Sequence, residues 1–127
     1  MKNKNSVSTN DAPLAIGTYS QAIITRSTVY ISGQIPLDSE SMELVGPDID
    51  LQVKQVMKNL GAICQNAGGS LNSVVKFTVF MTNLDHFATV NRVMQEFLQK
   101  PYPARSLVQV TALPKQADIE IDAIMEL

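Results

Sequence analysis

The spacing of hydrophobic residues changes along this 127-residue chain, and the changes limit the folds that it can adopt. Residues 20–24 and 28–35 are rich in β-branched and aromatic side chains, which is typical of strands. From Asp50 to Ala67 the apolar residues recur every three or four positions, as they do on one stripe of an α-helix. The strand pattern returns from Ser73 to Thr82, and a second helical pattern follows from His86 to Gln99. Two amphipathic helices are therefore expected among several strands.

The order of these segments predicts an α+β fold. Strands are expected at Ser20–Ile24, Thr28–Ile35, Ser73–Thr82, Arg105–Ala112 and Asp118–Met125. Helices and strands alternate only in the middle of the chain, so we expect a β-sheet with both helices on one face. Strand Ser73–Thr82 carries large apolar residues on both of its faces, as a strand that is covered on both sides does. Because no third helix is available, the simplest cover for the second face is another subunit.

The length fits a single domain spanning residues 1–127. The first 11 residues are polar and are expected to form a mobile N-terminal segment or an edge segment. The only cysteine, Cys64, lies on the apolar stripe of the first helix and is expected to be a core residue. The N-terminus lacks the apolar stretch of a signal peptide, and no apolar run approaches the roughly 20 residues of a membrane span. These features predict a soluble, cytoplasmic protein.

The composition also excludes several classes of function. The formal net charge is −2, and no cluster of lysine and arginine is present, so binding to nucleic acid is not expected. One cysteine and one histidine cannot supply the four ligands of a structural zinc site. The sequence contains no GxGxxG, GxxxxGK[ST], GxSxG or HExxH motif. No cofactor or metal is therefore expected.

Arg105 and Glu120 are lone charges in two segments that otherwise have the pattern of half-buried strands. In a hairpin of Arg105–Ala112 with Asp118–Met125, paired residues have a constant sum of residue numbers. Any odd sum places Arg105 and Glu120 on the same face, whereas an even sum separates them, so the inference depends on a loop with an even number of residues. The pattern alone favours a solvated cross-strand ion pair. The alternative is a binding site, in which the guanidinium holds a carboxylate and the carboxyl group holds or deprotonates a water molecule.

Four segments carry motifs that are highly specific when taken together. They are APLAIGTYSQAI (12–23), VYISGQIPLD (29–38), VVKFTVFMTNLDHFATVN (74–91) and YPARSLVQVTALPKQADIEIDAI (102–124). On these motifs the chain resembles the RidA/YjgF family of reactive-imine deaminases over nearly its whole length. The resemblance implies a chorismate-mutase-like α+β fold and a homotrimer with a central β-barrel and three clefts between subunits.

The resemblance also implies a reaction. Family members with the matching arginine hydrolyse 2-imino acids, such as 2-iminopropanoate and 2-iminobutanoate, to 2-oxo acids and ammonia. These imines form from enamines, such as 2-aminoacrylate, that arise when pyridoxal-phosphate enzymes dehydrate serine or threonine. A functional link to such dehydratases is therefore expected.

By the same resemblance, Arg105 would clamp the substrate carboxylate and Glu120 would orient the attacking water. Tyr19 would close the cleft and donate a hydrogen bond, and Ser32 and Gly33 would contribute backbone contacts. A glycine inside a strand pattern also indicates a bulge or the close approach of another group. For Tyr19 the alternative interpretation is a residue of the subunit interface.

Three further positions bear on substrate binding. Asn91, in the second helix, would add a contact to the site, and its alternative interpretation is a solvated helix residue. Thr18 stands where many relatives have proline, and Leu107 stands where many have cysteine. Leu107 would line the cleft mainly through backbone groups, so it would change the shape of the cleft and the substrate preference without removing hydrolysis.

Three other functions remain open at this point, and on one of them, a chaperone-like role, the sequence is silent. The same clefts would suit a non-catalytic regulatory trimer that binds 2-oxo acids. RNA cleavage and inhibition of translation have also been attached to this family, although the acidic charge balance and the lack of a histidine pair weigh against them.

Overall fold

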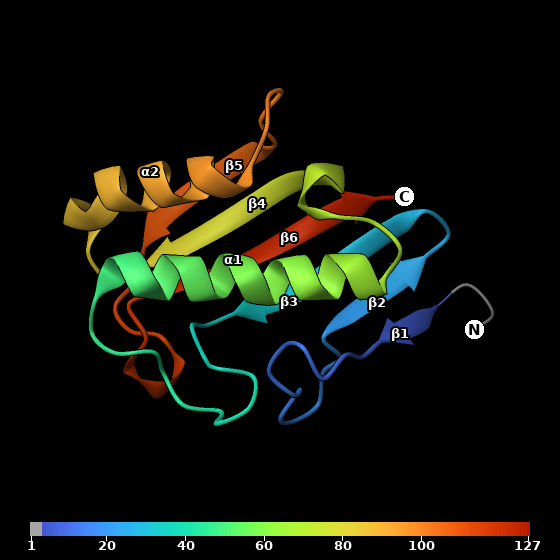
Figure 1. Ribbon diagram of the computed structural model, residues 1–127, viewed down its shortest axis with the longest axis horizontal. Coiled ribbons are helices and arrows are strands. Elements are labelled where there is room, and N and C mark those ends of the chain that lie inside the picture. Colours follow the sequence, from blue (N-terminus) through green and yellow to red (C-terminus); the bar gives the residue numbers. More distant parts are fainter. Residues whose placement is uncertain (1–3) are drawn as a thin grey trace.

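A six-stranded mixed sheet forms the centre of the computed structural model, which describes residues 4–127 (Figure 1). The strands are β1 (Asn5–Val7), β2 (Ala22–Thr25), β3 (Thr28–Gln34), β4 (Val74–Met81), β5 (Ala104–Gln109) and β6 (Ile119–Glu126). Their order across the sheet is β1-β2-β3-β6-β4-β5. Strands β4 and β5 are parallel, and all other neighbours are antiparallel. The predicted α+β class is confirmed.

The N-terminal segment is in part an edge strand. Asn5–Val7 pairs with Ala22–Ile24 of β2, and the side chain of Val7 is buried. The prediction of a mobile segment over residues 1–11 is therefore wrong for residues 5–7, where the alternative of an edge segment holds. Residues 1–3 lie outside the part of the chain that the structure describes.

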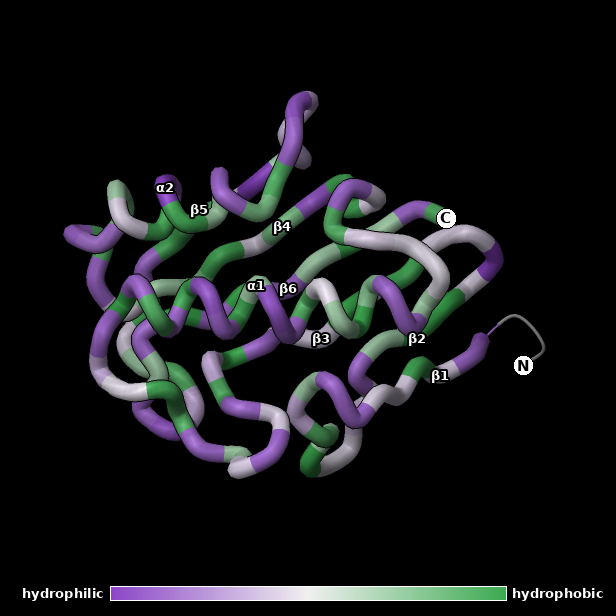
Figure 2. Tube along the Cα trace, viewed as in Figure 1, coloured by the Kyte–Doolittle hydropathy of each residue, from purple (hydrophilic) through white to green (hydrophobic). Residues whose placement is uncertain are grey.

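The helices α1 (Ile49–Asn66) and α2 (Phe87–Phe97) lie side by side on one face of the sheet (Figure 1). The Asp48 side chain caps α1 by accepting a hydrogen bond from the backbone N–H of Asp50. Hydrophobic and hydrophilic residues alternate along the turns of α1, as expected for a helix with one buried face (Figure 2). A short 3₁₀ turn, Leu84–His86, leads into α2.

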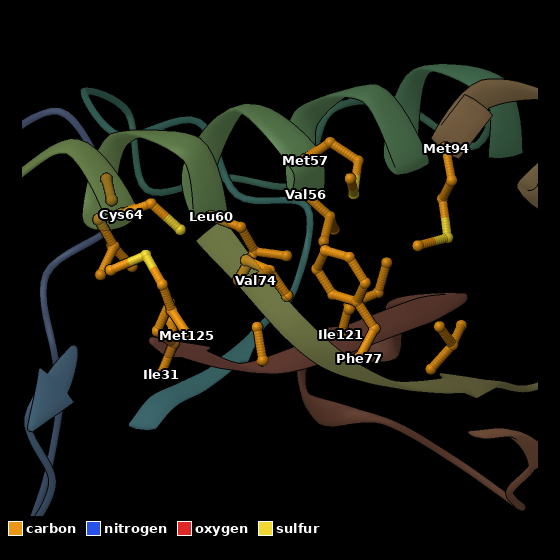
Figure 3. Close-up of a cluster of buried hydrophobic side chains, with 14 of the residues drawn as sticks. Ile31, Val56, Met57, Leu60, Cys64, Val74, Phe77, Met94, Ile121 and Met125 are labelled. Atoms are coloured by element: carbon orange, nitrogen blue, oxygen red, sulfur yellow. The ribbon is translucent and has the colours of Figure 1, made fainter. Parts of the chain in front are cut away.

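A hydrophobic core lies between the helices and the sheet (Figure 3). Alternate residues of the strands point into it, and α1 contributes Val56, Met57, Leu60 and Cys64, all fully buried. Burial raises the pKa of the Cys64 thiol to about 11, because the interior disfavours the thiolate. Cys64 therefore packs as a core residue, as its place on the apolar stripe predicts.

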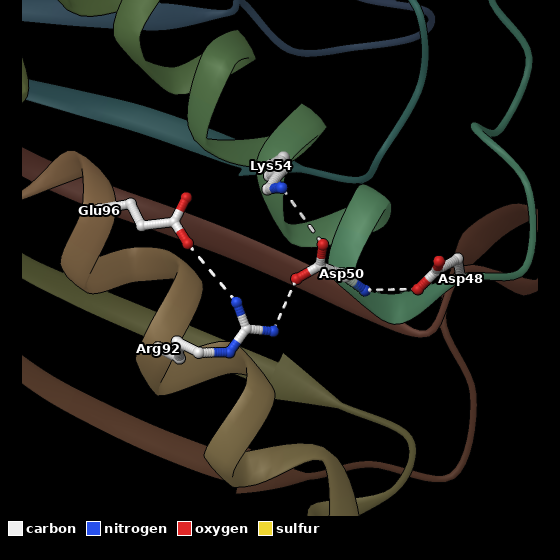
Figure 4. A network of polar contacts seen from close by, with 5 residues as sticks. All are labelled: Asp48, Asp50, Lys54, Arg92 and Glu96. Atoms are coloured by element: carbon white, nitrogen blue, oxygen red, sulfur yellow. Dashed lines mark hydrogen bonds and ion pairs between the residues drawn. The ribbon is translucent and has the colours of Figure 1, made fainter.

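Exposed ion pairs connect the two helices at the end where α1 begins (Figure 4). The Arg92 guanidinium of α2 lies 2.9 Å from Asp50 and 3.5 Å from Glu96, and Lys54 lies 3.2 Å from Asp50. The side-chain hydrogen bonds from Arg92 and Lys54 lower the pKa of Asp50. Such exposed pairs contribute little to stability, and the one between Arg92 and Asp50 links the two helices at the residue after Asn91.

The sheet face away from the helices carries apolar side chains that no described part of the chain covers. Tyr30 is 51% exposed and Val108 is 43% exposed, while Phe80 and Ile124 are half-buried. These residues belong to strands β3, β4, β5 and β6, so the exposed apolar surface extends across the sheet. The expected second subunit on this face stays a prediction.

The last two strands do not form the hairpin that the sequence suggested. Strand β6 lies between β3 and β4, and β5 pairs with the other edge of β4. The connection runs past the end of β4 through a 3₁₀ turn, Pro114–Gln116, in which Lys115 and Gln116 have positive φ. Short spacing between two strand patterns is typical of a hairpin. Here β5 pairs with one edge of β4 and β6 pairs with the other edge, so β4 lies between them.

Candidate functional site

The first group of predicted site residues gathers around Glu120. A cavity of about 350 Å³ opens on the sheet face away from the helices. It is lined by Tyr19, Ser32, Gly33, Ile35, Pro114 and Glu120. The structure therefore brings together four of the residues that the sequence predicted for the site, from the loop before β2 and from strands β3 and β6.

A β-bulge in β3 shapes this cavity. Ile31 pairs with Ala123 and Gln34 pairs with Ile121, so Ser32 and Gly33 together stand opposite one residue, Asp122. The bulge brings the Gly33 backbone so close to Glu120 that a Cβ atom on Gly33 would overlap the Glu120 carboxylate. Both interpretations of the in-strand glycine, a bulge and a close approach, are confirmed.

Hydrogen bonds hold the other two residues of this group. The Ser32 hydroxyl donates to the carbonyl oxygen of Ser20 at 2.6 Å, which ties β3 to the start of β2. The Tyr19 hydroxyl accepts a hydrogen bond from the backbone N–H of Ile16 at 3.2 Å. Tyr19 is 50% exposed as a whole residue, and it lines the open side of the cavity.

Glu120 is positioned by the start of β6. Gln52 of α1, only 2% exposed, bonds Asp118 twice: its amide N–H donates to the Asp118 carboxylate at 3.0 Å, and its carbonyl oxygen accepts from the Asp118 backbone N–H at 3.1 Å. These bonds anchor β6 two residues before Glu120. The pKa of Glu120 is raised, first because the side chain is half-buried and second because the Asp122 carboxylate is near it.

The second group gathers around Arg105, at the start of β5. The guanidinium donates to the Asn91 side-chain oxygen of α2 at 3.0 Å and lies over the Phe87 ring, 5.7 Å from its centre. Within residues 4–127, no carboxylate lies within ion-pairing distance of Arg105. The solvated ion pair with Glu120 is thus absent from the chain, and Arg105 keeps free donors for an anion.

A cavity of about 330 Å³ adjoins this guanidinium, between α2 and β5. Its lining residues are Phe77, Asn91, Met94, Gln95, Leu98, Tyr102, Pro103 and Arg105. Asn91 therefore has a defined contact with Arg105 and is not simply a solvated helix residue.

The two groups lie on opposite faces of the sheet. Arg105 pairs with Phe77 of β4, and Glu120 pairs with Phe80 of the same strand. Positions three apart on a strand point to opposite faces. The prediction that Arg105 and Glu120 share a face of one chain is therefore wrong, because it depended on the hairpin that does not form.

Two further residues lie near Arg105: Leu107, whose part in the cleft stays a prediction, and Phe87. Leu107 pairs with Val79 and packs against the core on the helix side of the sheet, the same face as Arg105. Phe87 was not singled out by the sequence as a site residue, and at 46% exposed it lies beside the Arg105 guanidinium. Its position four residues before Asn91 places both side chains on one side of the helix, and this spacing was the signal that could have found Phe87.

In the part of the chain that the structure describes, no three His, Cys, Asp or Glu side chains are grouped closely enough to hold a metal ion. None of the helices within residues 4–127 has the length and hydrophobicity that a bilayer span requires.

Comparisons with known proteins agree with this fold. The family model described as Endoribonuclease L-PSP matches residues 9–127. The chain is 46% identical to the 2-iminobutanoate/2-iminopropanoate deaminase of Rattus norvegicus, over 93% of this chain and 86% of that protein. It is 50% identical to the crystal structure of RidA from the Antarctic bacterium Psychrobacter sp. PAMC 21119, with a TM-score of 0.94 and coverage of 97% and 99% of the two chains.

A third similar structure contains a small molecule. The chain is 41% identical to E. coli TdcF, whose crystal structure has bound serine; the TM-score is 0.93, and the match covers 98% of this chain and 99% of that one. The chain belongs to the RidA/YjgF family, as its sequence motifs predict. The resemblance in fold is confirmed by these structures, and the presence of relatives named as imine deaminases makes that chemistry the first to consider for the two groups of site residues.

Proposed function

We propose that this protein hydrolyses reactive 2-imino acids, including those formed from 2-aminoacrylate, to 2-oxo acids and ammonia. The observation that carries the proposal is that the residues around Arg105 and those around Glu120 have complementary properties. One group offers a guanidinium with free donors, and the other offers a half-buried carboxyl group with a raised pKa beside an open cavity. The similarity to deaminases of this name supports the same reaction.

The two groups would meet in a cleft between subunits. Arg105 and Glu120 point away from each other in one chain, so a single subunit has only half of the site on each face. In a homotrimer, Arg105 and Asn91 of one subunit would face Tyr19, Ser32, Gly33 and Glu120 of the next. The uncovered apolar surface around Tyr30 and Val108 supports such an assembly.

Arg105 would bind the substrate carboxylate. A planar guanidinium forms two parallel hydrogen bonds with a carboxylate, which fixes both the position and the orientation of the bound acid. The bond to Asn91 and the Phe87 ring hold the guanidinium in place before the substrate arrives. The serine bound in TdcF is also a small α-substituted carboxylic acid, which supports this class of ligand.

Glu120 would position water and move protons. The water oxygen attacks the imine carbon, the π electrons of the C=N bond move to nitrogen, and a proton from the attacking water passes through Glu120 to that nitrogen. Glu120 then takes the hydroxyl proton of the resulting carbinolamine and passes it to the nitrogen. The C–N bond breaks, the nitrogen leaves as ammonia, and the C=O bond of the 2-oxo acid forms. Fixing the imine against a positioned water reduces the entropic part of the barrier.

The direct test couples the protein to a serine/threonine dehydratase that releases the enamine. Ammonia and 2-oxo acid release are followed with and without the protein, in a buffer in which free imine hydrolysis is slow. The proposal expects faster release with the wild-type protein. Binding of 2-oxobutanoate without faster release would instead indicate the regulatory trimer, and loss of RNA integrity in a parallel assay would indicate the ribonuclease activity that the family description names.

Gly33→Ala is expected to lower kcat/KM by about 10²-fold, because a displacement of about 1 Å in a catalytic group has an effect of this size. The new methyl group would push the Glu120 carboxylate out of its place. The thermal midpoint should change little, since the methyl meets the flexible end of a side chain. Gly61→Ala in α1 is the matched control: its Cβ would make ordinary contact with Leu71 at 3.6 Å, and activity should be retained.

The pH dependence of kcat/KM is expected to report Glu120. If the Glu120 carboxylate accepts the proton from water, kcat/KM falls as the pH decreases through the pKa of Glu120. This acidic limb of the pH profile is expected above the ordinary glutamate value of 4.5. Asp122→Asn removes a negative charge that raises this pKa, so the limb should move to lower pH. The exposed Asp85→Asn should not move it, and an unchanged limb in Asp122→Asn would contradict the assignment.

The raised pKa of Glu120 also predicts how the free energy of unfolding depends on pH. A glutamate whose pKa is higher in the folded state than in the unfolded state stabilises the fold only in its protonated form. That stability is present below about pH 4.5 and is lost as pH rises through the folded-state pKa of Glu120.

A further inference from the structure

The segment of residues 8–21 joins β1 to β2 and carries Tyr19 to the Glu120 cavity (Figure 1). Between these two strands the described chain forms neither a helix nor a strand. Apolar packing does not hold the part nearest the cavity, since Leu14 is 53% exposed, Ile16 is 64% exposed and Tyr19 is 50% exposed. The position of Tyr19 therefore depends on what holds the two ends of this segment.

The Gln21 side chain holds the start of this segment. Gln21 is 2% exposed. Its side-chain N–H groups donate to the backbone carbonyl oxygens of Thr9 at 3.0 Å, Ala12 at 3.4 Å and Pro13 at 2.8 Å. Its side-chain oxygen accepts a hydrogen bond from the backbone N–H of Thr9 at 2.7 Å. An amide side chain has two N–H donors and one carbonyl acceptor, so every polar group of the Gln21 side chain is used. Ala12 and Pro13 are buried as well, and residues 14–19 extend from this anchored end.

The backbone at Gln21 holds the end of the segment on the bulge of β3. The Gln21 carbonyl oxygen accepts from the Ser32 backbone N–H at 2.9 Å, and the neighbouring Ser20 carbonyl oxygen accepts from the Ser32 hydroxyl at 2.6 Å. Ser32 and Gly33 form the bulge, and the Gly33 backbone lies against the Glu120 carboxylate. Gln21 is therefore bonded both to the bulge beside Glu120 and to the start of the exposed segment.

We infer that Gln21 is a positioning residue of the proposed reaction: its side-chain hydrogen bonds fix the segment that holds Tyr19 at the Glu120 cavity. The inference rests on the proposed function, because it takes this cavity as the place of reaction and Tyr19 as a group that closes it. Gln21 does not line the cavity, so it acts through Tyr19 and not on the substrate. A wall that is held in place before the substrate binds reduces the entropic part of the barrier.

The test is a double-mutant cycle with Tyr19. Gln21→Met keeps the approximate length of the side chain but removes its hydrogen bonds, and kcat/KM for imine hydrolysis should fall by about 10²-fold, the effect of a displacement of about 1 Å. Gln21→Asn, which is one methylene shorter and keeps an amide, replaces it if Gln21→Met does not fold. Tyr19→Ala alone should also lower kcat/KM, and either substitution of Gln21 should cause no further loss in that background. Losses that multiply in the double variant, or wild-type kinetics in Gln21→Met or in Tyr19→Ala, would overturn the inference.

Asn59→Leu is the matched control for the loss of hydrogen bonds from a buried amide. Asn59 of α1 is 1% exposed, and its side chain donates to the Leu37 carbonyl oxygen at 3.0 Å, in the loop after β3. The substitution should lower the thermal midpoint, as Gln21→Met does. Any change that it causes in kcat/KM should be the same with tyrosine and with alanine at position 19, because Asn59 does not act through Tyr19.

Hydrogen exchange tests the role of Gln21 without any substrate. The Ile16 backbone N–H donates to the Tyr19 hydroxyl and not to Gln21, so its exchange rate reports on the segment itself. In Gln21→Met the Ile16 amide should exchange about tenfold faster or more, whereas Asn59→Leu should leave its rate unchanged. An unchanged rate in Gln21→Met would overturn the inference. Failure of the wild-type protein to hydrolyse imines would remove the proposed function, and the Ile16 rate would then still show whether Gln21 fixes the segment.

Discussion

Replacing Arg105 with alanine is expected to lower kcat/KM for imine hydrolysis by about 10²–10⁴-fold, which brings turnover to the level of the uncatalysed reaction in most assays. The estimate comes from losing two charge-assisted hydrogen bonds, each worth about 1.5–3 kcal/mol. Ground-state and transition-state binding should weaken together, so KM should rise as kcat/KM falls. The fold should persist, because Arg105 is exposed and forms its one side-chain hydrogen bond within residues 4–127 with Asn91.

One further variant at this position separates charge from geometry, and a second variant elsewhere serves as a control. Arg105→Lys keeps the positive charge but not the planar pair of donors, so its activity should lie between those of wild type and Arg105→Ala. Arg26→Ala, which removes an exposed arginine from the turn between β2 and β3, should retain full activity. Wild-type kinetics in Arg105→Ala would remove the clamp from the account.

Glu120→Gln is expected to lower kcat by about 10²–10⁴-fold, the usual contribution of a general acid or base. KM should change much less, since the amide keeps the shape of the side chain and Arg105 still holds the substrate. The variant should be at least as stable as wild type at neutral pH, because the raised pKa shows that the folded protein disfavours the charged form. Steady-state kinetics and thermal unfolding measure both effects.

Glu40→Gln is the control for this substitution, because Glu40 is an exposed carboxylate in the loop after β3. It should leave kcat unchanged. A Glu120→Gln variant with the kcat of wild type would mean that water is activated by another group, and the assignment of Glu120 would then be abandoned.

The helices and most strands were predictable because their periods are local properties of the sequence. The stripe through Val53, Leu60 and Cys64 predicted α1 to within about two residues, the usual uncertainty at helix ends. Gly33 predicted the bulge, because a glycine in the interior of a strand often marks a bulge or the close approach of another group. The short strand Asn5–Val7 was predicted only as one of two alternatives for the N-terminal segment, since three residues without an apolar pattern carry too little signal.

The pairing of the last two strands could not be predicted from the same information. A strand pattern states which residues share a face of one strand, but it does not state which strand is the neighbour. Insertion of β4 between β5 and β6 reverses the relation between Arg105 and Glu120 without changing any local pattern. The sequence therefore singled out Arg105 and Glu120, whose chemistry stays a prediction, whereas their separation onto two faces required the structure.

That separation makes the central claim testable: each active site would take Arg105 from one subunit and Glu120 from the next. The measurement is the activity of mixed oligomers, made by co-expressing the inactive variants Arg105→Ala and Glu120→Gln in equal amounts. With random assembly, roughly a quarter of the clefts in a trimer receive both intact residues, so about a quarter of the wild-type activity should return. Activity that stays at the level of the two separate variants would contradict a site shared between subunits.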